Sequence, residues 1–145
     1  MTERTISHGS FTIDRVFAAK PDRVFRAWSD PHQKSKWFPV GDVFDFRVGG
    51  REYQAGSAPD GNNYVFDVRY HDIVADQRIV YAYEMLMNGR RISVSVATVQ
   101  LLPEGEGTRV VVTEQGAFLD GLDTSLQREG GTNQLMDALG ASLAN

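Results

Sequence analysis

Residues that commonly carry catalysis or bind metals are sparse in this 145-residue chain. It has no cysteine, which excludes thiolate nucleophiles, disulfides and Cys-based zinc sites. Its three histidines, His8, His32 and His71, have no partner at a metal-ligand spacing such as H-x-x-x-H. No G-x-G-x-x-G or G-x-x-x-x-G-K-[ST] phosphate-binding motif occurs. We therefore expect neither a metal site nor a cofactor.

Serine and carboxylate side chains give no clear sign of a reaction. Ser93 and Ser95 are not framed by the G-x-S-x-G elbow of serine hydrolases. Glu84 interrupts an otherwise apolar segment, where a buried carboxylate would serve as an acid or base. We favour an exposed Glu84 that pairs with Arg91 or Arg69. The sequence thus leaves an enzyme open but favours a protein without catalysis.

Aromatic and methionine side chains form the most informative set. One interpretation is the wall of a pocket for a hydrophobic small molecule, since such pockets are mostly apolar with a few polar groups, and methionine adapts to irregular shapes. The other is an ordinary core with tyrosine hydroxyls at its rim. The set consists of Phe46, Tyr53, Phe66, Tyr81, Tyr83, Met85 and Met136.

Composition limits the classes of partner. The length predicts one domain. A net charge of -4 without a basic stripe argues against nucleic acid. No run of 18 apolar residues or signal-peptide-like stretch occurs, so we expect no membrane span and a cytoplasmic location. The oligomeric state stays open, with a homodimer among the options.

Helices are predicted near both ends of the chain. Residues 10–19 read as a strand, Pro21 then opens an amphipathic helix, and Asp30-Pro31 opens a second, short one. Further on, an apolar stripe at helical spacing predicts one long helix. Gly130-Gly131 lies within this segment, so we expect a kink, a break or a close approach to the sheet there, because each glycine costs a helix about 1 kcal/mol relative to alanine. The stripe consists of Thr132, Leu135, Met136, Leu139 and Leu143.

The middle of the chain alternates between apolar and polar residues. Between residues 42 and 118 this period of two predicts a meander, which gives about six or seven antiparallel strands in all. Asn88-Gly89 predicts a two-residue hairpin turn, because both positions of such a turn require positive φ. We expect the next strand to direct Ile92, Val94 and Val96 inward. Together the segments predict an α+β domain in which the last helix covers the apolar sheet face.

Motifs spread over most of the chain resemble the activator-of-heat-shock-ATPase-like (AHSA-type) branch of the START-like, SRPBCC superfamily. The resemblance implies one domain over residues 1–145 with a helix-grip fold: a curved antiparallel sheet wrapped around a long C-terminal helix, with two short helices after the first strand. It also implies a ligand cavity between sheet and helix. The motifs are Arg15, Phe17 and Pro21, Val24-Phe25 and Ala27, Asp30-Pro31, Trp37-Phe38, Gly49-Gly50 and Asp60-Gly61.

The resemblance adds two candidate ligand-binding residues to the aromatic and methionine set. Trp37 occupies the position at the cavity mouth, although Trp37-Phe38-Pro39 would equally serve as a plug that closes the open end of the core. Thr132 stands where many relatives carry tryptophan. The function that it implies is binding of a small hydrophobic ligand. One alternative is a cyclase- or hydrolase-like enzyme, which needs at least two inward polar residues facing one another. Another is a co-chaperone-like module for a protein partner, which needs an exposed apolar patch. Chaperone activation belongs to relatives with an additional domain, so we do not transfer it.

Overall fold

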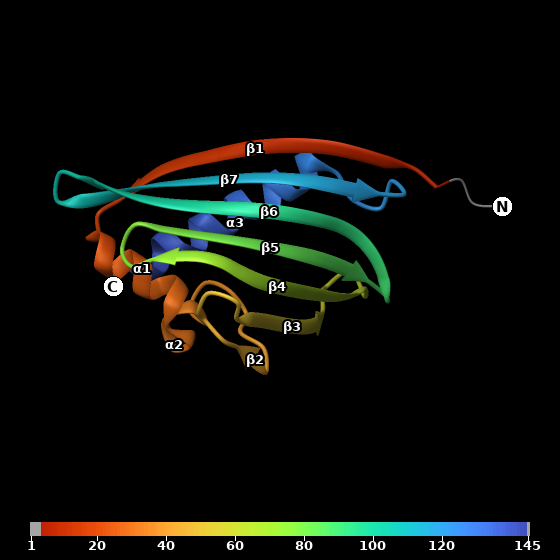
Figure 1. Cartoon of the computed structure of the whole chain (residues 1–145), viewed down its shortest axis with the longest axis horizontal. Coiled ribbons are helices and arrows are strands. Elements are labelled where there is room, and N and C mark those ends of the chain that lie inside the picture. The colour runs from red at the N-terminus through yellow and green to blue at the C-terminus, as the bar shows by residue number, and fades with distance from the viewer. Residues whose placement is uncertain (1–3, 145) are drawn as a thin grey trace.

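The computed structural model describes residues 4–144 and shows one curved antiparallel sheet with a long helix along one face (Figure 1). The strand order is β1-β7-β6-β5-β4-β3-β2. The α+β helix-grip architecture predicted from the sequence is confirmed. The strands are β1 (Ile6–Phe17), β2 (Val43–Phe44), β3 (Arg51–Ser57), β4 (Asn63–Val74), β5 (Arg78–Met87), β6 (Arg90–Glu104) and β7 (Gly107–Leu119), and the helices are α1 (Pro21–Ser29), α2 (Pro31–Lys34) and α3 (Ser125–Leu143).

Two short helices close one end of the sheet. Pro21 occupies the first turn of α1, where its missing N–H leaves no intrahelical bond unmade. The Asp30 side chain caps α2 by accepting hydrogen bonds from the backbone N–H groups of His32 and Gln33. Trp37 then donates its indole N–H to the carbonyl oxygen of Ala27 at 2.9 Å. This bond fixes the segment after α2 against α1.

The long helix α3 runs without a break, which corrects one prediction. We expected Gly130-Gly131 to break or kink the helix or to approach the sheet closely. Instead, the helix is continuous from Ser125 to Leu143, and a Cβ atom at either glycine would meet no atom within 4 Å. The glycines therefore leave space beside the helix rather than making a tight contact. The predicted inward stripe is confirmed, since Met136 and Leu139 are buried.

The inner face of β6 differs from the prediction. We expected Val94 and Val96 to point inward, but they are 44% and 43% exposed, whereas Ser93 and Ser95 are buried. A register irregularity between Met85 and Leu86 on β5 lies opposite this part of β6 and shifts the alternation. As a result, two small hydroxyl residues face α3 where two valines were expected.

Other local predictions are confirmed. Asn88 and Gly89 form the β5–β6 turn with φ values of 52° and 81°. Glu84 lies on the outer sheet surface, where its carboxylate accepts from the Arg91 guanidinium at 3.1 Å. Among residues 4–144, no helix is long and apolar enough to cross a membrane.

Candidate functional site

A pocket of about 310 Å³ lies between α3 and the inner sheet face. Its sheet side comes from β3 to β7, and its remaining walls come from α1, the segment after α2, and α3. Most of the lining is aromatic or aliphatic, which suits an apolar molecule. The lining residues are Trp28, Trp37, Phe38, Pro39, Gln54, Phe66, Tyr81, Tyr83, Met85, Val99, Val112, Glu114, Arg128, Gly131, Thr132, Leu135 and Met136.

Most of the predicted ligand-binding residues come together around this pocket. Phe46 and Tyr53 lie outside its lining: the Phe46 ring packs on Phe25 and Tyr70, and the Tyr53 ring lies under the Arg51 guanidinium. That the lining residues bind a ligand stays a prediction. The predicted residues that line the pocket are Trp37, Phe66, Tyr81, Tyr83, Met85, Thr132 and Met136.

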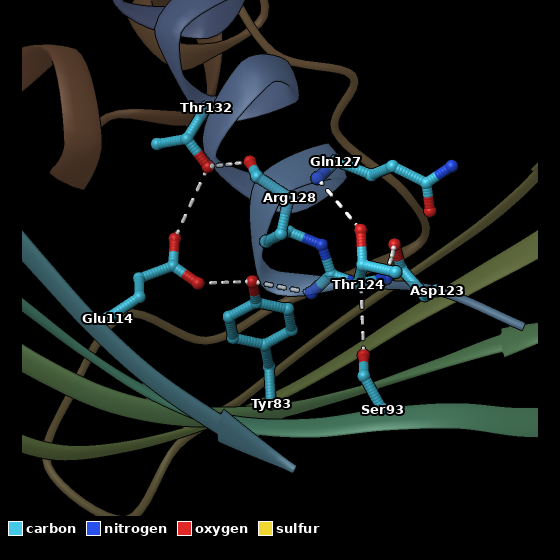
Figure 2. A network of polar contacts seen from close by, with 8 residues as sticks. All are labelled: Tyr83, Ser93, Glu114, Asp123, Thr124, Gln127, Arg128 and Thr132. Carbon is cyan, nitrogen blue, oxygen red and sulfur yellow. Dashed lines mark hydrogen bonds and ion pairs between the residues drawn. The ribbon is translucent and has the colours of Figure 1, made fainter. Parts of the chain in front are cut away.

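Four polar side chains meet on one side of the pocket and form what we call the polar wall: Tyr83, Glu114, Arg128 and Thr132. Figure 2 shows them converging from β5, β7 and α3. The Tyr83 hydroxyl donates to Glu114 Oε1 at 2.5 Å and accepts from Arg128 Nη1 at 2.8 Å. Tyr83 therefore links a carboxyl group to a guanidinium through one short chain of hydrogen bonds.

The Glu114 side chain is buried, and the residue is only 5% exposed. Burial raises its pKa above the ordinary value, although the hydrogen bond from Tyr83 and the charge of Arg128 both act to lower it. Burial, with the nearby Glu114 charge, also raises the pKa of Tyr83, so this phenol keeps its proton. The Tyr83 hydroxyl is thus held as a hydrogen-bond donor to the Glu114 carboxyl group.

Thr132 contacts the second oxygen of the Glu114 carboxyl group. Its Oγ1 is 2.9 Å from the Arg128 carbonyl oxygen and 3.4 Å from Glu114 Oε2. A hydroxyl has a single proton to donate, and the closer Arg128 carbonyl is the better acceptor. The Thr132 hydroxyl therefore donates mainly to that carbonyl and only weakly to Glu114 Oε2, which is the less satisfied of the two carboxyl oxygens.

The positive charge of Arg128 is already balanced within the protein. Its Nη2 donates to Ser93 Oγ at 2.9 Å and forms an ion pair with Asp123. The side chains of Arg128 and Asp123 are both mostly buried. Burial acts to lower the pKa of Arg128, but Tyr83 and Asp123 together raise it above the ordinary value. Arg128 therefore stays charged, and its pairing leaves the wall without a free cation.

Tyr81 also lines the pocket, next to Tyr83 on the same face of β5. Its hydroxyl makes no hydrogen bond to any residue between 4 and 144. Burial, followed by the charge of Glu114, raises its pKa well above the ordinary value. An unpaired phenol in an apolar pocket is a donor available to a bound molecule.

Sequence reasoning missed Glu114 and Arg128 as site residues. Glu114 shares the inward face of β7 with Val110 and Val112, so the period of two could have identified it. Arg128 precedes Thr132 by one helical turn, which places both on the same face of α3. Both residues could therefore have been identified as polar members of the predicted inward faces of β7 and α3.

A second buried polar cluster lies outside the pocket lining. Lys34 Nζ, at the end of α2, donates to Glu52 Oε1 at 2.6 Å, and the Tyr70 hydroxyl donates to the same oxygen at 2.5 Å. Glu52 is fully buried, and its Oε2 has no partner among the described residues. Burial lowers the pKa of Lys34 against the opposing effect of Glu52. This buried pair ties α2, and with it the pocket segment that follows, to the sheet.

Comparisons with known proteins agree with this architecture. The family model described as Activator of Hsp90 ATPase homolog 1-like protein matches residues 18–144. No curated protein matches the sequence.

Several solved structures are similar along almost their whole length. The Mll3558 protein from Rhizobium loti is 45% identical with a TM-score of 0.90, covering 96% of this chain and 99% of that one. An uncharacterized protein from Rhizobium leguminosarum is 40% identical with a TM-score of 0.91, covering 99% of each chain. Protein CV1439 from Chromobacterium violaceum is 26% identical with a TM-score of 0.78, covering 94% of this chain and 97% of that one.

Proposed function

Because this chain belongs to the Activator of Hsp90 ATPase homolog 1-like family, we propose that it is a START-like domain that binds one small, mostly apolar molecule. The observation that carries the proposal is the pocket of about 310 Å³ with a single polar wall. Ligand sites of this kind are largely hydrophobic and use a few placed polar groups to orient the ligand. The volume lies at the lower end of the usual range of about 300–1,000 Å³.

The charges around the pocket favour a neutral ligand. Among the described residues that line the pocket, Arg128 is the one basic residue and is paired with Asp123, so no unpaired cation awaits a bound anion. Burying an anion without a partner is costly in an apolar site. The Tyr81 hydroxyl is instead suited to donate to a neutral acceptor, such as a carbonyl oxygen. The ligand class is therefore a small apolar molecule with a carbonyl or hydroxyl group.

A small enzyme acting in the same pocket is the second candidate. It requires at least two inward polar residues that face one another, and the Glu114 carboxyl and the Tyr83 hydroxyl are such a pair at 2.5 Å. The structure offers no comparable argument for a co-chaperone-like module. Its exposed large apolar side chains are dispersed over different elements, and scattered residues of this kind are normal on protein surfaces.

Placing a leucine at Gly131 should weaken ligand binding about 5- to 150-fold. Gly131 lines the pocket, and open space surrounds the position of its Cβ, so the new side chain would occupy volume needed by the ligand. Such steric overlap costs about 1–3 kcal/mol, which corresponds to that change in affinity. A thermal-shift screen of lipids, aromatic compounds and polyketide-like ketones measures this loss of affinity as a smaller rise in melting temperature. A ligand at a hundredfold excess over Kd stabilises the native state by about 2.7 kcal/mol.

Gly130→Leu is the matched control. Gly130 is also helical and surrounded by open space, but it does not line the pocket. Both variants should stabilise α3 to a similar degree, since each removes a helical glycine. Equal ligand-induced shifts in the two variants, or no shift of the wild-type protein by any compound, would contradict the proposed binding site.

A further inference from the structure

The two oxygens of the Glu114 carboxyl group have different surroundings. Oε1 accepts the short hydrogen bond from Tyr83, whose hydroxyl is in turn held by Arg128. Oε2 has only the 3.4 Å contact with Thr132 among the residues that the structure describes. The carboxyl group is thus fixed through one oxygen, while the other has a single long contact with Thr132 (Figure 2).

A hydrogen-bond donor for the ligand lies on the same face of the sheet. Tyr81 precedes Tyr83 by two residues on β5, their ring centroids are 5.9 Å apart, and both line the pocket with Glu114. Tyr81 is the one of these tyrosines whose hydroxyl has no partner among residues 4–144. A ketone whose carbonyl oxygen accepts from Tyr81 would lie in the pocket that Glu114 also lines.

We propose that Glu114 and Tyr81 catalyse enolisation of a bound neutral ketone. In the forward step, Glu114 Oε2 takes a proton from the carbon beside the carbonyl group: the C–H bond breaks and an O–H bond forms. The electron pair of the broken bond moves through the new C=C bond to the carbonyl oxygen, and this enolate oxygen accepts a hydrogen bond from Tyr81. Return of the proton to the same or a conjugated carbon restores a ketone, so no oxidant, reductant or co-reactant is consumed. This inference rests on the proposed function, because it requires the ligand to occupy the pocket.

The surroundings of Glu114 suit this role. Burial raises its pKa, which makes its carboxylate a stronger base than an exposed glutamate. Tyr83, Thr132 and the paired Arg128 face it from β5 and α3, and the remaining neighbours along the pocket are mainly apolar. A preorganised phenol beside a developing enolate stabilises charge most effectively among apolar neighbours. Tyr83 and Arg128 act as positioning residues, since Tyr83 donates to Oε1 and Arg128 holds the Tyr83 hydroxyl.

Deuterium exchange in 2-tetralone tests this inference. This small, neutral, bicyclic ketone has exchangeable protons beside its carbonyl group, and NMR in D2O follows their loss. We expect the wild-type protein to accelerate exchange over buffer alone. Glu114→Gln should lower the acceleration by about 10²–10⁴-fold, and Tyr81→Phe by about 10²–10³-fold. Glu84→Gln is the matched control, because Glu84 lies on the outer sheet surface, and it should exchange like the wild type.

Binding of 2-tetralone is measured separately, from the shift in melting temperature of each variant. Binding with accelerated exchange that depends on Glu114 supports the inference. Binding without acceleration, or with equal acceleration by Glu114→Gln, overturns the inference and leaves the proposed binding function in place. Absence of binding to the wild-type protein counts against this ligand class in the proposed function and removes the inference with it.

Discussion

Replacing Lys34 with methionine should lower the free energy of unfolding by about 3–5 kcal/mol. Lys34 and Glu52 form an ion pair in which the side chains are 6% and 0% exposed. Methionine retains much of the volume of lysine, so the main loss is the charge that balances Glu52. A buried carboxylate left without its cation is far less stable than the intact pair. Urea denaturation of the two proteins at neutral pH measures the difference.

A double variant separates charge from packing. In Lys34→Met/Glu52→Gln no charge is left uncompensated, and the glutamine oxygen can still accept from the Tyr70 hydroxyl. We therefore expect the double variant to be more stable than Lys34→Met alone. The Glu52→Gln variant alone completes the comparison. If the double variant is less stable than Lys34→Met by as much as Glu52→Gln destabilises the wild-type protein, the two residues are not coupled. The buried pair then does not hold α2 to the sheet.

Leu139→Ala should destabilise the protein by about 2–5 kcal/mol, as large-to-small changes at buried leucines do. Leu139 is fully buried on α3, and the buried positions of that helix are few because part of its inner face borders the pocket. Leu126→Ala in the same helix is the control, because Leu126 is 79% exposed. It should change stability by no more than about 0.5 kcal/mol.

Thermal or chemical unfolding of both leucine variants tests the orientation of α3. Similar effects at the two positions would show that Leu139 does not face the core. The same orientation brings Thr132 and Met136 to the pocket, so the result bears on the site as well as on the fold.

Local patterns were sufficient to predict most of the fold. The stripe that ends at Leu143, the Asn88-Gly89 turn and the alternation of β4 and β5 each depend on neighbouring residues, and all are found in the structure. The face of β6 was predicted incorrectly because Val94 and Val96 suggest burial, while the deciding feature is an irregularity in pairing with β5. Valine also tolerates an exposed strand position, so residue type alone could not correct the error.

The polar part of the candidate site was harder to predict, since it depends on contacts between distant elements. Glu114 and Tyr83 are separated by 31 residues, and Lys34 and Glu52 by 18. Nothing in the local sequence around Glu52 distinguishes a buried glutamate from an exposed one. The Gly131 prediction failed for a related reason: the glycine borders open space in the pocket, which cannot be inferred from helix propensity.

The central claim, that a small apolar molecule binds between α3 and the sheet, is tested most directly by NMR with methionine methyl groups labelled with ¹³C. Met85 and Met136 line the pocket, whereas Met87 lies outside its lining and serves as an internal control. With a ligand identified in the thermal-shift screen, we expect intermolecular NOEs from the ligand to the methyl groups of Met85 and Met136 and none to that of Met87. A ligand that binds but shows no NOE to Met85 or Met136 would contradict the claim, because it would occupy another part of the protein.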